Sequence, residues 1–222
     1  MKKFLAITLL SGLAGAAQAQ TAIKAGTIQL GGNVGYAHSS VESPISTGSS
    51  FNVKQTTVNN QFTIAPSIGF FVADNLAVGI SGAYQINQQK NTYSPRQGYR
   101  DYEAKVKQFR IGAFVQYYKM LTEQFGLTGT LGGGYQYYGQ PYNFGNDEVA
   151  TKGAYANLTP AIVFFPIPKL AIGASIGGIN YDYTSYKTPA IFSNPDTYTA
   201  SSFEANFGLS QLLFSGTYYF GR

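Results

Sequence analysis

The chain has no cysteine and no tryptophan among its 222 residues. Without cysteine no disulfide framework can hold the fold, so stability has to come from backbone pairing and burial. Charged residues make up only 11% of the chain, whereas soluble domains usually carry about 25%. The formal net charge of +5 is small and its residues are scattered, which argues against a nucleic-acid partner.

Long apolar runs are missing from most of the sequence, and none beyond the N-terminus approaches the roughly 18 residues of a membrane helix. At the N-terminus, Lys2-Lys3, an apolar run from Phe4 to Leu13 and Ala17-Gln18-Ala19 match a cleavable export signal. We therefore predict a signal peptide at residues 1–19 and a single domain at residues 20–222.

Alternation with a period of two residues is the feature that the sequence does have. In IAPSIGFFVADNLAVGIS, residues 64–81, large apolar residues alternate with small or polar ones on both sides of Asp74-Asn75. This pattern predicts two strands and a tight turn. It recurs along the chain and predicts eight strands, at residues 26–39, 59–72, 76–87, 104–119, 125–138, 153–166, 170–184 and 202–220.

The connections between these strands alternate in length. Three are short, at residues 73–75, 121–124 and 167–169, and four are long, at residues 40–58, 88–103, 139–152 and 185–201. This asymmetry is typical of barrels in the bacterial outer membrane. We predict an all-β fold, an eight-stranded antiparallel up-and-down transmembrane β-barrel with four long extracellular loops and three short periplasmic turns.

The two faces of the predicted strands differ in polarity. One face collects large apolar residues such as Ile80 and Ile111, and the other collects small or polar ones such as Ser67 and Thr130. Charges lie in loops or at strand ends, as expected if a Lys or Arg facing lipid at mid-depth costs about 2 to 4 kcal/mol. We expect hydrocarbon outside, a lumen filled by side chains without a wide pore, and girdles of Tyr and Phe at both rims.

Three segments carry a resemblance to a known family: the hairpin Pro66–Gly79, its echo PAIVFFPIPKLAIGAS from Pro160, and the C-terminal strand Gly216–Phe220. With the export signal, they make the chain similar to the small outer-membrane barrels of the OmpA/OmpX-like, porin-family type. The resemblance implies an outer-membrane location and insertion by the barrel-assembly machinery with periplasmic chaperones. It also implies an assembly signal at Tyr218 and Phe220, although Gly221-Arg222 follow here.

Three positions conflict with regular strands. Pro66 and Pro160 lie inside predicted strands, where proline removes a ladder donor, and the outward phase of the last strand slips near Gln211. We expect a β-bulge at each of these positions.

Candidate catalytic residues are few. The single histidine, His38, is followed by Ser39, Ser40 and Glu42, but it lacks the spaced base and orienting group of a catalytic triad. No metal-ligand cluster or phosphate-binding loop is present. We predict no enzymatic activity and no cofactor; a lipid-modifying outer-membrane enzyme is the alternative that His38 leaves open.

Two inward charges, Arg110 and Glu204, are expected at comparable depth on opposite strands. We predict that they pair across the lumen, because an isolated interior charge is costly. Asp182 is the alternative partner if the phase slips at Gly177-Gly178, and separate contacts with water or polar groups are the other possibility.

A basic loop is the last candidate site. Its cations, interleaved with tyrosines, are expected at the height of lipopolysaccharide phosphates, although a solvated loop explains them equally well. They are Lys90, Arg96, Arg100, Lys105 and Lys107.

The sequence as a whole favours a non-enzymatic integral outer-membrane protein, a monomer, with a structural role in the envelope and surface loops for adhesion or recognition. A narrow solute channel and a soluble lipocalin-like carrier are the alternatives.

Overall fold

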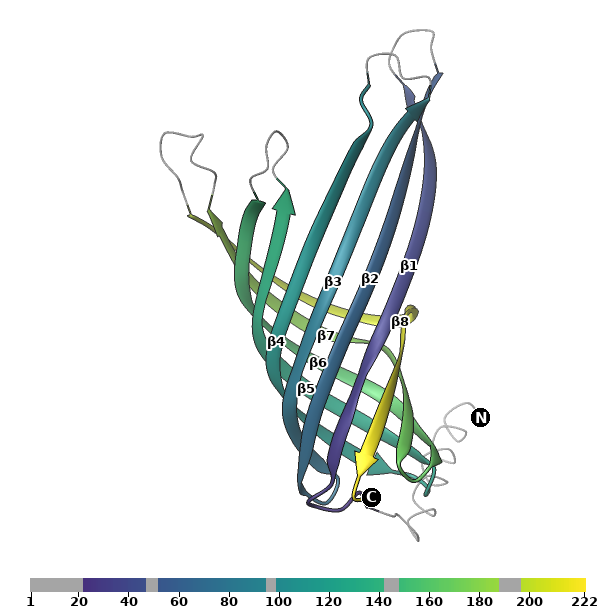
Figure 1. The fold of residues 1–222 in the computed structure, drawn as a ribbon, viewed down its shortest axis with the longest axis vertical. Coiled ribbons are helices and arrows are strands. Elements are labelled where there is room, and N and C mark those ends of the chain that lie inside the picture. Colours follow the sequence, from purple (N-terminus) through teal and green to yellow (C-terminus); the bar gives the residue numbers. More distant parts are fainter. Residues whose placement is uncertain (1–21, 47–51, 95–98, 142–147, 188–196) are drawn as a thin grey trace, which may run out of the picture.

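The computed structural model describes residues 22–46, 52–94, 99–141, 148–187 and 197–222, and the predicted signal peptide lies outside them. These residues form a closed antiparallel barrel in which the strands follow one another in chain order (Figure 1). The predicted fold class is thus confirmed. The strands are β1 (Ile28–Ser46), β2 (Asn52–Ala73), β3 (Leu76–Ser94), β4 (Tyr102–Met120), β5 (Phe125–Pro141), β6 (Glu148–Ile167), β7 (Leu170–Lys187) and β8 (Thr197–Phe220).

The strands extend further than predicted at the end opposite the short turns. β1 and β2 stay in register up to the pair Ser46↔Asn52, although the sequence predicted a loop over residues 40–58. The segment is rich in Ser, Thr, Asn and Gln. Where both faces of a strand meet water, backbone pairing continues but hydrophobic alternation disappears, so the sequence signal ends before the strand does.

Two of the three predicted bulges are present. The β6–β7 register shifts between Leu158 and Ala161, beside Pro160. In the β7–β8 pair, Ile176 faces Leu212 whereas Gly177 faces Phe207, so residues 208–211 of β8 have no partner on β7. Figure 1 shows the resulting bend in the yellow strand.

The bulge predicted at Pro66 is wrong. The β2–β3 register is the same at Ile64↔Tyr84 and at Ser67↔Ser81, on either side of this proline. Pairing with β3 is interrupted at residues 65 and 66 instead, while Pro66 still faces Gly32 of β1. The missing N–H of Pro66 therefore falls in a gap of the ladder, and no extra residue is needed.

The outer face of the barrel is apolar at mid-height. Ile80, Ile111 and Leu131 are 60%, 50% and 58% exposed, and they point away from the axis. A cluster of buried apolar residues lies at the lower end, around Phe71 and Tyr219. The polarity predicted for the two faces is therefore present in the structure. No helix in the described segments is long and apolar enough to span a membrane.

Candidate functional site: the lumen, its floor and its mouth

The lumen contains a cavity of about 550 Å³. Hydroxyl and amide side chains such as Thr63, Ser81, Thr130 and Asn157 line it. The expectation of a filled interior is therefore corrected. Small inward residues such as Gly132, Ser67 and Ala65 line the space and leave it open.

A floor of aromatic rings closes the cavity at the short-turn end. Phe71, Tyr118, Phe165 and Tyr219 are each at most 2% exposed, and their ring centroids lie 5.3 to 6.4 Å apart. Arg222 stacks on this layer, with its guanidinium carbon 3.6 Å from the centroid of Phe165. The floor blocks the axial route, which argues against a solute channel.

Hydrogen bonds fix the upper surface of this floor. The Tyr118 hydroxyl donates to Gln29 Oε1 at 2.9 Å and lies 3.0 Å from the Tyr219 hydroxyl. Gln29 Nε2 donates to Gln116 Oε1 at 2.9 Å. These contacts join β1, β4 and β8 and hold the two phenol rings in place.

The sequence interpretation placed aromatic doublets such as Phe70-Phe71 and Tyr117-Tyr118 in the rim girdles. It also expected Tyr118 to point inward, but it did not predict that inward rings form a floor. Alternation in fact divides each doublet: Tyr117 points outward and Tyr118 inward, and Phe70 and Phe71 are divided in the same way. The doublets themselves were the signal, since neighbouring residues of a strand face opposite sides.

The segment before β1 covers the floor from below. Ile23 is fully buried against it, and its backbone N–H donates to Asn75 Oδ1 at 2.9 Å. Asp74 accepts from the Ala25 N–H and from Lys24 Nζ, both at 3.0 Å. These two hydrogen bonds lower the pKa of the Asp74 carboxyl below its usual value. The β2–β3 turn thus clamps the segment under the barrel.

Arg110 lies at the mouth of the cavity, and its partner is Asp182, not Glu204. Arg110 Nη2 lies 3.1 Å from Asp182 Oδ1 and 3.1 Å from the Tyr138 hydroxyl, and the guanidinium sits over the Tyr155 ring at 5.1 Å. Glu204 is exposed and accepts a hydrogen bond from Asn206 at 3.2 Å. The predicted Arg110–Glu204 pair is therefore wrong, and the alternative partner is the one present.

The β7–β8 irregularity explains this exchange. Glu204 faces Asn180, whereas Asp182, two residues further along β7, faces Ser202. Above the β8 bend, β8 pairs only with β7 in the described residues, so Glu204 is carried away from the lumen.

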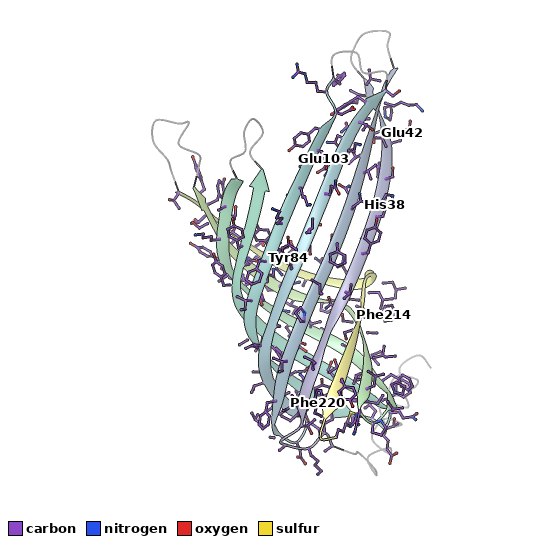
Figure 2. The ribbon with its side chains drawn as sticks, in the orientation of Figure 1. His38, Glu42, Tyr84, Glu103, Phe214 and Phe220 are labelled. Carbon is purple, nitrogen blue, oxygen red and sulfur yellow. The ribbon has the colours of Figure 1, made fainter. Side chains whose placement is uncertain are left out.

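His38 has Asn60 as its side-chain neighbour. Its Nδ1 lies 2.7 Å from Asn60 Oδ1, directly across the β1–β2 ladder. Figure 2 shows His38 on β1, above the level of Phe214. Glu42 is engaged by Lys54 at 2.8 Å. Within the described ranges, no group of three His, Asp or Glu side chains could hold a metal ion.

The predicted basic loop is mostly strand. Lys90 belongs to β3, Lys105 and Lys107 belong to β4, and Arg100 is exposed between the two strands. Arg96 lies outside the described residues. The register pairs Lys90 with Glu103, and Figure 2 shows Glu103 well above Tyr84. The three lysines share the outward face of this hairpin, because they alternate in phase with Phe109 and Tyr84.

The predicted assembly residues lie on the outer face beside the first strand. Tyr218 faces Leu30 and Phe220 faces Ile28 across the β1–β8 ladder. Their rings contact each other at 4.8 Å between centroids.

The chain is similar in fold to several solved outer-membrane proteins. OprG of Pseudomonas aeruginosa has 18% sequence identity and a TM-score of 0.46, and the match covers 90% of this chain and 98% of OprG. Neisserial surface protein A has 13% identity and a TM-score of 0.45, with 87% of this chain and 96% of that protein covered. Outer membrane protein W of Escherichia coli has 13% identity and a TM-score of 0.44, with 89% of this chain and 100% of that protein covered. They are eight-stranded barrels of the type that the sequence resembles. No protein-family profile and no curated protein sequence matches the chain.

Proposed function

We propose that the chain is a non-enzymatic integral outer-membrane protein, with its wall in the bilayer and its long hairpins presented outside for recognition. The outward row of β4 carries this proposal. Between Lys107 and Lys119 every outward residue is uncharged, in the order Phe109, Ile111, Ala113, Val115 and Tyr117. At about 3.3 Å per residue and a tilt of about 45°, the two lysines are roughly 28 Å apart along the normal. The apolar band of outer-membrane barrels is about 25 Å tall.

The exposed apolar belt argues against the alternative of a soluble lipocalin-like carrier, which would keep such residues inside. Val34 is 67% exposed and Ile80 is 60% exposed. In water these side chains would form one continuous adhesive ring. In a bilayer they contact lipid, and the polar side chains of the lumen contact water.

Topology can be tested with an epitope inserted between Ser46 and Asn52. Intact cells are expected to display the epitope, whereas the same epitope between Asp74 and Asn75 should become accessible only after the outer membrane is permeabilised. Fractionation should recover the protein with the outer membrane, and unboiled samples should migrate differently from boiled ones on gels. A protein recovered in plain buffer, with both epitopes accessible, would exclude the proposal.

The outward lysines above the belt support a role in binding lipopolysaccharide phosphates. Lys105 and Lys107 continue the lipid-facing row of β4 directly above Phe109, at the height where headgroups lie. The K105Q/K107Q variant is expected to bind lipopolysaccharide more weakly and with less sensitivity to salt. The matched control is K169Q, at a short turn of the opposite rim. Equal binding by both variants would leave the lysines as ordinary solvated residues.

A further inference from the structure

The barrel is joined by a short ladder between its first and last strands. β1 and β8 pair only from Ile28↔Phe220 to Gly32↔Gly216 in the described residues. β1 continues to Ser46 paired with β2, and β8 above the bend pairs with β7. We call the opening that starts above Gly32 and Gly216 the seam.

Backbone geometry explains where the seam begins. Gly32 has a φ of 153°, which residues with a Cβ rarely adopt. A Cβ added at this position would also collide with the backbone of Ala65. β8 in turn bends at residues 208–211, where it loses its partners on β7. The two irregularities lie at different heights: Gly32 belongs to the last β1–β8 pair, opposite Gly216, and the bend of β8 lies higher, beyond Leu212.

The seam opens inside the apolar belt. Leu30 below Gly32 and Val34 above it both point outward and are 50% and 67% exposed. On the other side, Leu212 and Phe214 are also exposed, and Figure 2 places Phe214 close to the bend of β8. Unpaired backbone N–H and C=O groups at this depth each cost several kcal/mol in hydrocarbon. A molecule with polar groups is therefore favoured there.

The luminal cavity reaches the seam from inside. Its lining includes Gly32 and Asn33 of β1 and Leu213 and Ser215 of β8. The volume of about 550 Å³ lies within the range of about 300 to 1,000 Å³ typical of small-molecule sites. Since the aromatic floor closes the lower end, the cavity is blind in that direction.

The chemistry of the lining defines the occupant. Among the described residues, Arg110 is the one charged side chain that lines the cavity, and Asp182 neutralises it. The remaining polar groups are hydroxyls and amides, and the rings of Phe114 and Tyr155 also face the cavity. Hydroxyls and amides donate and accept hydrogen bonds without favouring either charge.

We propose that the seam binds a membrane amphiphile with an uncharged, hydroxyl-rich headgroup, placing the headgroup in the lumen and the hydrocarbon chain outside, between Val34 and Phe214. The headgroup satisfies the luminal polar groups and the free backbone groups of the seam. The chain remains in contact with lipid and with apolar side chains. This inference rests on the membrane-spanning arrangement proposed above.

The test uses the full exported chain in phospholipid nanodiscs with two alkyl glucoside probes. One probe carries a photoreactive diazirine on the sugar and the other carries it at the end of the alkyl chain. The sugar probe is expected to label luminal residues such as Asn33 and Thr63, and the chain probe is expected to label Val34 and Phe214. Sugar labelling confined to the outer girdle would overturn the inference.

A pair of variants separates the seam from the lumen in general. Ser215→Phe places a ring at the luminal side of the seam and is expected to reduce luminal labelling at least about tenfold, a factor that corresponds to 1.4 kcal/mol. Thr130→Phe places the same ring on the far wall, on β5, and is expected to reduce it much less. Equal loss in both variants would overturn the inference, because it would show that entry does not use the seam.

Two readouts keep the result interpretable. Labelling of Ile80 and Ile111 by the chain probe reports that a variant has folded into the bilayer. If wild type lacks this labelling, the proposed function fails; if wild type shows it without luminal labelling, only the present inference fails. Disulfide-linked dimers of Val34→Cys would show that a second copy covers the seam, and this result would also overturn the inference.

Discussion

The guanidinium of Arg110 on β4 lies 3.1 Å from the carboxylate of Asp182 on β7, so the only charge lining the described cavity is neutralised within the wall. The two side chains are 30% and 24% exposed, and this partial burial makes the loss of one partner costly. Asp182→Asn is expected to destabilise the barrel by about 1 to 3 kcal/mol. Glu204→Gln, which removes the partner expected from sequence, should change stability by less than about 0.5 kcal/mol. Samples heated to increasing temperatures before electrophoresis show where each variant loses the gel mobility of the folded barrel, and this measurement compares the two variants.

A charge exchange tests the pairing itself. The double variant R110D/D182R is expected to recover part of the stability that each single variant loses, because the charges remain opposite. An equally large loss in the single and double variants would mean that Arg110 acts through Tyr138 and Tyr155 rather than through Asp182.

The hydroxyl of Tyr118 is the central hydrogen-bonding group of the floor. Tyr118→Phe removes its bonds to Gln29 and Tyr219 and leaves the ring packing intact. A loss of about 1 to 3 kcal/mol is expected in urea titrations followed by mobility on gels. Tyr117→Phe is the matched control, since its ring points outward, and should lie within about 0.5 kcal/mol of wild type. Similar losses in the two variants would contradict the role of the floor hydrogen bonds.

How far the sequence determines this structure differs between the wall and the ends. Alternation was sufficient to predict the number and order of the strands, and which side of the wall residues such as Ile80 and Ile111 face. It failed at the outer hairpins, where both faces of a strand are polar. It also failed at Asp182, because a β-bulge exchanges the inward and outward positions of the residues beyond it, and the sequence of those residues does not reveal the exchange. The seam was invisible for a related reason: the sequence shows that two strands exist but not how far they pair.

The clamp between Asp74 and the segment before β1 is expected to depend on pH. The folded-state pKa of Asp74 is lowered by the Ala25 N–H and by Lys24, so the carboxylate stabilises the clamp above the unfolded-state pKa of about 4. This stabilisation is lost as pH falls through the lowered folded-state value. A spin label on Ala22→Cys should therefore become more mobile at strongly acidic pH in the otherwise wild-type chain. In Asp74→Asn the label should be mobile throughout; a pH response equal to that of wild type would exclude Asp74 as the titrating group.

A lysine in the belt should be costly only on the outer face. Ile111→Lys places a charge at mid-depth and is expected to destabilise the folded barrel by about 2 to 4 kcal/mol. Ser81→Lys points into the lumen, where the side chain can reach water in the cavity, and should be tolerated better. Folding titrations in lipid vesicles compare the two. The reverse order would show that the faces are assigned the wrong way round.

The extent of the seam can be measured by disulfide trapping, for which a chain without cysteine has no background. Leu30 and Tyr218 face each other in the ladder, so L30C/Y218C should oxidise readily, because paired strand residues have Cα atoms within disulfide reach. Continuing the same register would place Val34 opposite Phe214, but Gly32↔Gly216 is the last pair of the ladder and the strands separate above it. V34C/F214C is therefore expected to stay reduced within one molecule. Equal oxidation of both pairs would mean that the ladder continues upward and closes the wall at the level of the cavity.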